Sequence, residues 1–486
     1  MLSRAEIRAI YDQGPEAVIA LVERLMATLE AQQEQVAQVN ARVKEMEDRL
    51  ALNSRNSSKP PGSNAFAHRV KASRAASGKK SGAQPGHPGT TLKASPAPEH
   101  VVQHRAVVCQ SCGQNLSGEK GVPDHDRRQV FEVPPLTLAV TEHQRLVKRC
   151  PRCGTHTGGK FPAGVAPGVQ YGPQLKALVV YLVEYHLLPW QRTCELLGDL
   201  LGQPIAEGTL AAALTTCAQG LGQPEEQIKQ ALTRAPVAHF DETGMYVAGH
   251  REWIHVASTA LLTHYGSHAK RGGEATKAIG ILPTFTGRAV HDAWAPYFAY
   301  ACTHGLCNAH HLRELTFVHE QLGQGWAGEM KDLLVKIKHA VGQAQERGVT
   351  TLSSAQQRCF ARTYDHLLAT GLLMPDNQSA LPSGKRGRPK QTKAKNLLDR
   401  LVQHKEKALA FMSDFAVPFD NNQAERDLRM LKVQQKISGC FRSTGGAQVF
   451  CRIRGYISTI KKQGRNVLAA LSSVFAGNPF SPLPEG

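Results

Sequence analysis

The sequence has 486 residues, of which 41% are hydrophobic and 20% charged, an ordinary composition for a soluble globular protein. This length exceeds what one compact core covers, so we expect several domains. The longest apolar run, 177–188, is interrupted by Glu184 and is too short to span a bilayer, which argues against a membrane protein.

The N-terminal residues are polar and charged and show no signal-peptide pattern, so we expect a cytosolic protein. Its cysteines are then reduced thiols or metal ligands rather than disulfides. The formal net charge of +18 indicates a polyanionic partner, although charge alone does not separate DNA, RNA and anionic lipid. Two stretches concentrate this charge: 51–98 has eight Lys or Arg and no acid, and 426–465 has ten against one Asp.

Residues 1–52 carry a heptad pattern that predicts a coiled-coil helix. The apolar positions follow an alternating three–four spacing over about four heptads, with one polar interruption at Gln32. The members of this seam are Val18, Val22, Leu25, Leu29, Gln32, Val36, Val39, Val43, Met46 and Leu50. We favour self-association through the seam; the alternative is a long helix packed on its own protein. The following segment, 53–100, is rich in Ser, Pro, Gly and cations and predicts a disordered basic linker, either lying along DNA or merely solvated.

Two Cys-x-x-Cys-Gly knuckles lie at 109–113 and 150–154, with 37 residues between Cys112 and Cys150. Tetrahedral zinc needs four ligands, and each knuckle offers two thiolates on one tight turn. We therefore predict that the segment 101–165 is a zinc ribbon with a structural Zn²⁺, with short strands at 125–135 and 136–150 between the knuckles. The predicted zinc ligands are Cys109, Cys112, Cys150 and Cys153. The alternative is four unrelated core cysteines, which the duplicated spacing disfavours.

Residues 170–235 have helical periodicity. Within them, a helix, a turn with Gly202 and Pro204, and a second helix from Glu207 resemble a helix-turn-helix. Any helical hairpin gives a similar pattern, so DNA recognition and simple packing both stay open here.

From Pro236 the pattern changes to short β-branched runs separated by polar turns, which predicts strands of a mixed sheet in 236–320. The predicted strands are 237–247, 251–265, 277–285 and 288–294. Apolar residues lead directly into Asp241 and Asp292, which predicts a carboxylate at the C-terminal end of a strand in both cases. An Asp at such a place is often only a turn former.

A third acid lies on a strongly basic helix in the stretch "VPFDNNQAERDLRM", 417–430. Its local interpretation is structural: Asn422 as N-cap, Glu425 three residues on as a capping box, and a Glu425–Arg429 ion pair. However, Arg429, Lys432 and Lys436 share the face of Glu425 on a helical wheel, which capping alone does not explain. Three carboxylates together suit Mg²⁺, and two such ions activate the attacking oxygen and stabilise the leaving oxygen of a phosphodiester displacement. Oxygen ligands alone do not choose between Mg²⁺ and Mn²⁺.

Several segments closely resemble the insertion-sequence-66 family of bacterial transposases. They are "HFDETGM" (239–245), "GILPTFTGRAVHDAW" (280–294), "LCNAHHLREL" (306–315) and the block 419–464, with "NSSKPPGSN", "GAQPGHPG" and the paired knuckles before them. The resemblance implies an RNase H-like α/β core with a DDE acid triad, which the matching positions assign to Asp241, Asp292 and Glu425. Asp420 and Asp427 are the alternatives for the third acid. The spacings are 51 and 133 residues, so we expect a mostly helical insertion at 321–412.

The fold expected is therefore multidomain α+β: coiled coil, zinc ribbon, helical DNA-binding region, and RNase H-like core. The core resumes after the insertion at 413–475, and 476–486 is a tail. The expected function is that of a DNA transposase of an insertion sequence, which hydrolyses phosphodiesters at transposon ends and joins the freed 3′-hydroxyls to target DNA. Asp241 and Asp292 are then metal ligands, and Glu425 binds the second ion. The alternatives are a non-catalytic, domesticated DNA-binding protein and a nuclease that cuts without joining.

The resemblance also implies double-stranded DNA as a partner, a homodimer or higher oligomer, small accessory proteins of the same element, and a place at the nucleoid in the bacterial cytoplasm. Phosphate contacts are expected from the basic side chains Arg429, Lys432, Lys436, Arg442, Arg452 and Arg454. Glu242 would face the other side of its strand and is not expected to be a ligand. Cys307, His310 and His311 could be interpreted as a second zinc site. Three ligands at the start of one helix are poorly placed for a tetrahedron, however, so we expect these residues to pack, to cap the helix or to contact DNA. The segment 385–393 resembles an AT-hook, or is simply a basic loop.

Overall fold

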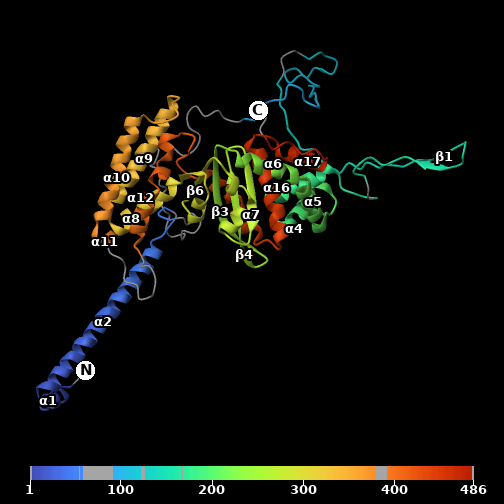
Figure 1. Ribbon diagram of the computed structural model, residues 1–486. Coiled ribbons are helices and arrows are strands. Elements are labelled where there is room, and N and C mark those ends of the chain that lie inside the picture. The colour runs from blue at the N-terminus through green and yellow to red at the C-terminus, as the bar shows by residue number, and fades with distance from the viewer. Residues whose placement is uncertain are drawn as a thin grey trace. The chain divides into compact units, whose positions relative to one another are not determined.

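The computed structural model divides by its contacts into two compact units (Figure 1). The larger unit is made of Met1–Ser73, Pro167–Cys194 and Ile205–Gly486, and the smaller of Arg74–Ala166 and Glu195–Pro204. The structure describes residues 3–53, 55–57, 91–121, 126–165, 168–378 and 391–483. Most of the predicted basic linker, and of the segment that resembles an AT-hook, lies outside these ranges. No helix within them combines the length and apolar character needed to cross a membrane.

A mixed five-stranded sheet forms the centre of the larger unit, in the order β5-β4-β3-β6-β7. Its strands are β3 (Val237–Val247), β4 (His250–Ser258), β5 (Thr263–His268), β6 (Arg288–His291) and β7 (Thr303–Leu306). The pairs β3–β4 and β4–β5 are antiparallel, whereas β3–β6 and β6–β7 are parallel. The mixed sheet predicted from the β-branched runs is thus present, with β3 at its centre.

The predicted strand at 277–285 is wrong. This stretch forms the end of helix α7 (Gly273–Ile279) and the 3-10 helix η3 (Leu282–Thr284). Gly280 separates the two in a left-handed conformation, with φ of 80°. A short apolar run does not by itself distinguish a strand from a buried helix, and here Ile281 and Leu282 are buried against one face of the sheet.

The side chains of β3 alternate between two hydrophobic clusters. Ala238 and Phe240 pack on the side of α6 (Gly222–Thr233), α7 and η3. Met245 and Val247 pack on the opposite side, against α15 (Asn422–Ser438) and α16 (Thr444–Lys462). By this alternation Asp241 faces the side of α15.

Residues 172–233 are helical, as predicted. They form α3 (Pro173–Val180), the π-helix η2 (Tyr181–Tyr185), α4 (Trp190–Leu201), α5 (Glu207–Gly220) and α6. The start of the second helix at Glu207 agrees with the predicted turn, and Gly202 has a positive φ of 67°. The C-terminal helix α17 (Val467–Phe475) packs on α3 and α5.

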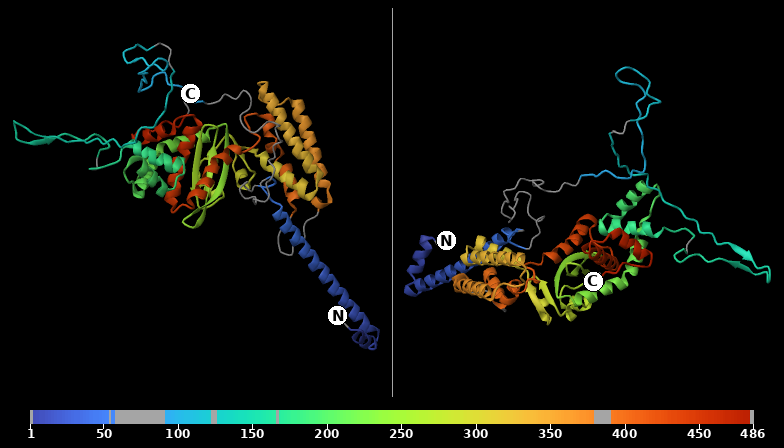
Figure 2. Two further views of the ribbon diagram at one scale, coloured as in Figure 1. Left: turned by 180° about the vertical axis from the view of Figure 1, so that it is seen from behind. Right: turned by 90° about the horizontal axis from the view of Figure 1, so that it is seen from above.

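The long segment between β7 and α15 is mostly helical, as predicted for 321–412. Its helices are α8 (Asn308–Leu322), α9 (Gly325–Glu346), α10 (Ser354–Leu373), α11 (Pro375–Gln378), α12 (Lys393–Gln403), α13 (Lys405–Ala408) and α14 (Ala410–Ser413). Both views of Figure 2 show the longer ones side by side. They enclose a core of their own around Trp326, Met330, Tyr364 and Leu398.

The N-terminal region contains two helices and not one. Helix α1 (Arg4–Tyr11) begins with a capping box from Ser3, and α2 (Pro15–Leu50) follows a break at Gly14, whose φ is 100°. The predicted heptad seam runs along α2, where six of its apolar residues are 50–60% exposed. These are Val22, Leu25, Leu29, Val36, Val39 and Met46.

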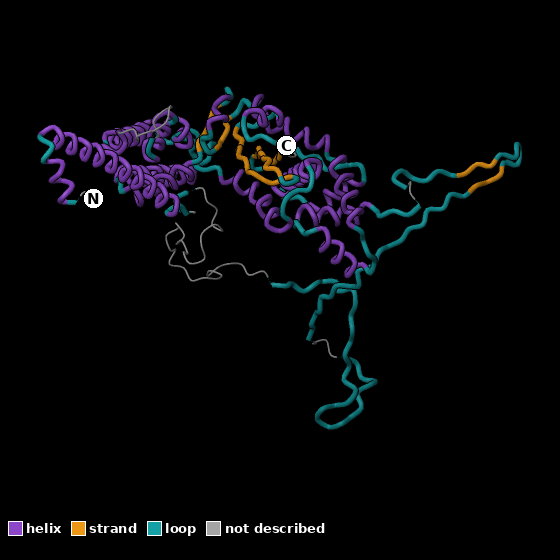
Figure 3. Tube along the Cα trace, turned by 90° about the horizontal axis from the view of Figure 1, so that it is seen from below, coloured by secondary structure: helices purple, strands orange, loops and turns teal. Residues whose placement is uncertain are grey.

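In the smaller unit, the two strands predicted between the knuckles are largely absent. Residues 126–146 have no strand, and only β1 (Val147–Arg149) forms, paired with β2 (His156–Gly158) around the second knuckle. Figure 3 shows most of this unit as teal loop. Stretches with strand-like residues but no cross-strand partner do not form a ladder.

Two predicted phosphate contacts are instead part of the packing of α16. Arg454 is 4% exposed and donates from Nη1 to the carbonyls of Glu184 (3.0 Å) and Tyr185 (3.2 Å). Arg452 is half-buried and pairs through Nε with Glu225 at 2.6 Å. The prediction is therefore wrong for Arg454, because a buried guanidinium does not reach DNA, and Arg452 joins α16 to α6. The basic composition of the stretch suggested exposed cations, but α16 packs on several sides, and both side chains are used by those contacts.

The buried carboxyl of Glu184 generates a testable dependence of stability on pH. Burial raises the pKa of Glu184 from 4.5 to about 8, and its Oε2 has no hydrogen-bond partner in the described chain. The folded protein therefore retains a proton that the unfolded chain loses above pH 4.5, so stability falls as pH rises toward 8. We expect Glu184→Gln to flatten this fall, with a gain of a few kcal/mol (order of magnitude) in the free energy of unfolding near pH 8.

The measurement is urea unfolding at a series of pH values for wild type, Glu184→Gln and the exposed-site control Glu207→Gln. The control should follow wild type. A parallel pH profile for wild type and Glu184→Gln would show that Glu184 is ionised in the folded protein.

Candidate active site

The register of the sheet brings Asp241 and Asp292 level with each other on neighbouring strands. The last printed pair between parallel β3 and β6 is His239 with Val290, and each Asp lies two residues beyond it. Neighbouring strands are about 4.8 Å apart, and residues at the same level face the same side. Asp292 follows the end of β6, as predicted, whereas Asp241 lies in the middle of β3 opposite Val256 and not at the strand's end. Only the pairing with β6 stops near Asp241.

The surroundings of Asp241 are strongly negative. Burial raises the pKa of Asp241 well above its usual value, and the nearby charges of Glu242, Asp292 and Glu425 raise it further. The backbone N–H of Glu242 donates to Asp241 Oδ1 (2.8 Å), and that of Trp294 donates to Asp292 Oδ1 (3.0 Å). Carboxylates that repel one another in this way favour a bound cation.

Asn421 fixes the start of helix α15 against β3. Its side chain is 1% exposed, accepts from His239 Nδ1 (2.8 Å) and donates to the carbonyl of Phe240 (2.9 Å). Its backbone N–H donates to Cys307 Sγ at 3.1 Å. Glu425 lies four residues on, one helical turn above this anchor and on the side of the sheet that Asp241 faces. The sequence drew attention to the cluster of amides here, but not to this role of Asn421.

The capping predictions for this helix are wrong. The N-cap is Asn421 and not Asn422, and it makes no side-chain capping hydrogen bond. Glu425 does not form a capping box: its Oε1 is buried without a hydrogen-bond partner in the described chain. Glu425 pairs with Arg313 (3.9 Å) and not with Arg429, and its Oε1 lies 4.0 Å from His310 Nδ1. A carboxylate held only by such long contacts and used by no cap has its oxygens available for a ligand.

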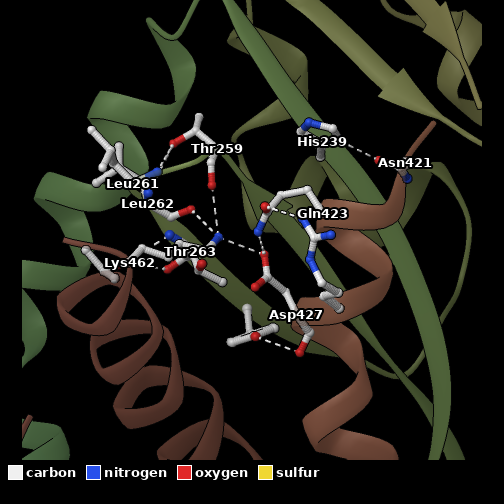
Figure 4. A network of polar contacts seen from close by, with 12 residues as sticks. His239, Thr259, Leu261, Leu262, Thr263, Asn421, Gln423, Asp427 and Lys462 are labelled. Carbon is white, nitrogen blue, oxygen red and sulfur yellow. Dashed lines mark hydrogen bonds and ion pairs between the residues drawn. The ribbon is translucent and has the colours of Figure 1, made fainter. Parts of the chain in front are cut away.

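The two alternative acids are engaged elsewhere. Figure 4 shows Asp427 in a network in which its Oδ2 accepts from Lys462 Nζ (2.8 Å) and Gln423 Nε2 (3.1 Å). Lys462 also donates to the carbonyls of Thr259 and Leu262, so Asp427 joins α15 to α16 and the β4–β5 turn. Asp420 accepts from the N–H of Asn422 (3.2 Å) at the helix start.

Glu242 points to the opposite face of β3, as strand alternation predicts. Its Oε1 accepts from Arg271 Nε (2.9 Å) and Nη2 (2.7 Å), and Tyr297 donates to its Oε2. Burial raises the pKa of Glu242, and these hydrogen bonds oppose the rise. Its oxygens are thus used by protein partners on the far side of the sheet.

Four of the predicted phosphate contacts are exposed around α15: Arg429, Lys432, Lys436 and Arg442. Lys432 Nζ donates to the carbonyl of Gly244 (2.8 Å), which places it beside β3. The segment before Arg442 pairs with the end of β3, since the N–H of Phe441 donates to the carbonyl of Tyr246 at 3.0 Å. This pairing holds Arg442 next to the β3–β4 hairpin.

The two knuckles have the same turn geometry. In each, the Gly N–H donates to the first Cys carbonyl: Gly113 to Cys109 (3.0 Å) and Gly154 to Cys150 (2.9 Å). Hydrogen bonding lowers the pKa of Cys109, chiefly from the N–H of Cys112, and of Cys153, chiefly from the Thr155 hydroxyl. Thiols of lowered pKa on such turns suit Zn²⁺. Within the described ranges, however, the cysteines of the two knuckles do not come close enough together to form one metal site.

Family models match three parts of the chain. A model of the IS66 family of transposases matches residues 168–449, and one described as a zinc-finger binding domain of transposase IS66 matches residues 107–154. A family of unknown function (DUF6444) matches residues 5–93. The comparison with curated proteins gave no match. Because the first model covers more than half of the chain, including Asp241, Asp292 and Glu425, this protein belongs to the IS66 family of DDE transposases.

Proposed function

We propose that the protein hydrolyses phosphodiesters at the ends of an insertion sequence and transfers the freed 3′-hydroxyls to target DNA. The observation that carries this proposal is that Asp241 on β3 and Asp292 just after β6 each lie two residues beyond the last pair of these parallel strands, with the unpaired oxygen of Glu425 on the helix that packs on β3. The sheet order, with β3 between antiparallel β4 and parallel β6, supports an RNase H-like core.

The carboxylates of Asp241, Asp292 and Glu425 fit hard divalent ions, because Asp241 is buried among negative charges whose repulsion a bound cation relieves. Two Mg²⁺ or Mn²⁺ ions, when bound, would activate the attacking oxygen and stabilise the leaving one. Asp241 and Asp292 would hold an ion between two strands. Glu425 would bind the second ion and orient the attacking water or 3′-hydroxyl. Arg313, 3.9 Å from Glu425 Oε2, supplies positive charge beside the scissile phosphate.

The exposed basic side chains of α15 and Arg442 support DNA binding next to the acids. Arg429, Lys432 and Lys436 follow Glu425 on one face of the helix, so a DNA backbone lying along it meets successive cations. Arg452 and Arg454 are not included, because they pack against the helical region.

The zinc knuckles and the helical region would bind the DNA of the transposon end. Cys109, Cys112, Cys150 and Cys153 would hold a structural Zn²⁺ that orders the loops of the smaller unit. The helix-turn-helix-like pair α4–α5 gives weaker support for DNA binding, because α5 contains one Glu and no Lys or Arg. Small accessory proteins of the same element are further candidate partners, and the proposed place of action is the bacterial nucleoid.

The exposed seam of α2 would join two protomers so that two transposon ends are paired before cutting. Val22, Leu29, Val36 and Val43 occupy one type of core position, and the β-branched valines, three of the four, favour two-stranded parallel coiled coils there. In that arrangement Arg42 of one helix and Glu47 of the other are opposite charges at flanking positions, which supports the parallel orientation.

Substituting Glu425 tests the triad directly. Glu425→Gln keeps the shape but weakens a metal ligand, so we expect cleavage and strand transfer on labelled end-containing DNA with Mg²⁺ to fall by about 10²- to 10³-fold. DNA binding should persist. The matched control is Asp420→Asn, an acid of the same segment with a structural partner, which should stay within about tenfold of wild type.

Full activity of Glu425→Gln would show that Glu425 is not one of the catalytic acids. Binding without cutting by wild type, with accessory proteins supplied, would favour a non-catalytic DNA-binding protein. Cutting without joined products would favour a nuclease.

Asn421 tests how the acids are positioned. Asn421→Ala removes the hydrogen bonds to His239 and Phe240, so we expect a loss of about 2 kcal/mol in the free energy of unfolding. Cleavage should fall by more than stability explains at a temperature where the variant stays folded. Asn422→Ala is the neighbouring control, and equal losses in the two variants would contradict an anchoring role.

The seam of α2 is tested by molecular mass in solution. Leu29→Lys places a charge in the predicted core, so we expect the mass from light scattering to fall to that of one chain. Ala27→Lys lies on the outer face and should leave the mass of the oligomer unchanged. An unchanged mass for Leu29→Lys would show that α2 does not hold protomers together.

A further inference from the structure

The start of α8 and the first turn of α15 bring together a thiol, an imidazole and a carboxylate. Cys307 is the N-cap of α8, and His310 follows in its first turn with Cys-x-x-His spacing. Glu425 comes from α15, more than a hundred residues later. One ligand atom from each lies within 4.8 Å of the others, and within the described ranges no other group of three or more candidate ligands does so.

Two of these three groups have unsatisfied atoms that face each other. His310 Nδ1 and Glu425 Oε1 are both buried without a hydrogen-bond partner in the described chain, and they lie 4.0 Å apart. That distance is too long for a hydrogen bond. Buried polar atoms without partners are rare and call for an explanation such as an ion. Metal bonds of about 2.0 to 2.3 Å to N, O and S span a gap of this size.

We propose that Cys307, His310 and Glu425 form a binding site for a borderline divalent ion, with Zn²⁺ as the best match. A thiolate and an imidazole select Zn²⁺ over Mg²⁺, which prefers oxygen ligands. Three protein ligands leave the fourth tetrahedral position open. On binding, the Sγ–metal bond replaces the S–H bond and the proton goes to solvent. The existing hydrogen bond from the Asn421 N–H to Cys307 Sγ then stabilises the thiolate.

The site shares Glu425 with the proposed catalytic centre. An ion held by Oε1 withdraws that oxygen from the Mg²⁺ pair, while Oε2 stays near Arg313. Zn²⁺ would therefore oppose Mg²⁺-dependent cleavage. This regulatory consequence rests on the proposed function, whereas the metal site itself does not.

The first test counts zinc in the full-length protein and needs no activity. Wild type, Cys307→Ser, His310→Ala and the control Cys302→Ser are equilibrated with Zn²⁺, desalted and measured for metal per chain by plasma mass spectrometry. Cys302 is a buried cysteine outside the cluster. We expect Cys307→Ser and His310→Ala each to hold one ion fewer than wild type and Cys302→Ser, because zinc at the knuckles is unaffected.

Equal zinc content in all four proteins would overturn the proposal. His310→Ala keeps it falsifiable if Cys307→Ser does not fold, since His310 is partly exposed. With Co²⁺ as a second probe, wild type should gain a thiolate-to-metal absorption that Cys307→Ser lacks beyond that of the knuckles.

The second test addresses antagonism. Added Zn²⁺ should inhibit Mg²⁺-dependent cleavage by wild type and by Cys302→Ser, and inhibit His310→Ala at least tenfold more weakly, a difference of about 1.4 kcal/mol in zinc affinity. If zinc is bound but no protein cleaves DNA, the proposed function fails while the metal site stands. If cleavage occurs and zinc inhibits all variants equally, the shared use of Glu425 is wrong.

Discussion

Buried Asn421 is the residue on whose contacts the geometry of the site depends. Its side chain joins β3 through His239 and Phe240, its backbone N–H joins the start of α8 through Cys307, and the residue itself begins α15. Each hydrogen bond is shielded from water, so breaking one leaves a buried donor or acceptor unpaired. Because Glu425 is one turn beyond Asn421, the same contacts that hold the helix start set the distance between the third acid and the sheet. A helix anchored only by apolar packing slides more easily than one held by directional bonds.

The chain has to return to the sheet in the 133-residue spacing between Asp292 and Glu425, and Asn308 helps to make that return specific. Asn308, which is fully buried, donates from its side chain to the carbonyl of Ala408 (2.9 Å) and from its backbone to that of Phe419 (3.0 Å). The beginning and the end of the insertion are thus held together beside β7. Its helices bury their own apolar faces, so the segment adds little strain to the sheet. A long spacing between the second and third acids is therefore compatible with a well-defined site.

Local sequence patterns were sufficient to predict the features that depend only on neighbouring residues. The β-branched run at 237–247 predicted β3 with its bounds, and strand alternation put Asp241 and Glu242 on opposite faces. The pattern failed at 277–285, where a short apolar run is equally compatible with a helix buried against a sheet. The prediction also failed for Arg454, since a run of basic residues shows a positive segment but not which of its side chains another part of the chain covers. The group of Cys307, His310 and Glu425 was missed because its third member comes from α15, and a tetrahedron was sought within one helix start.

Glu425 and Asp427 show how neighbouring acids of one helix acquire different roles. Two residues apart, they point about 200° from each other around the axis, so each meets a different neighbourhood. Asp427 meets Lys462, a nearly buried ammonium that has two backbone carbonyls as its other partners, and the resulting pair closes a structural joint. Removing either side chain would leave the charge of the other buried and unpaired. Glu425 meets only long contacts, at 3.9 and 4.0 Å, to groups that are themselves partly exposed. Its oxygens are therefore the ones that can bind an ion with little loss of stability. The other ligands of that ion would be Asp241 and Asp292, or Cys307 and His310.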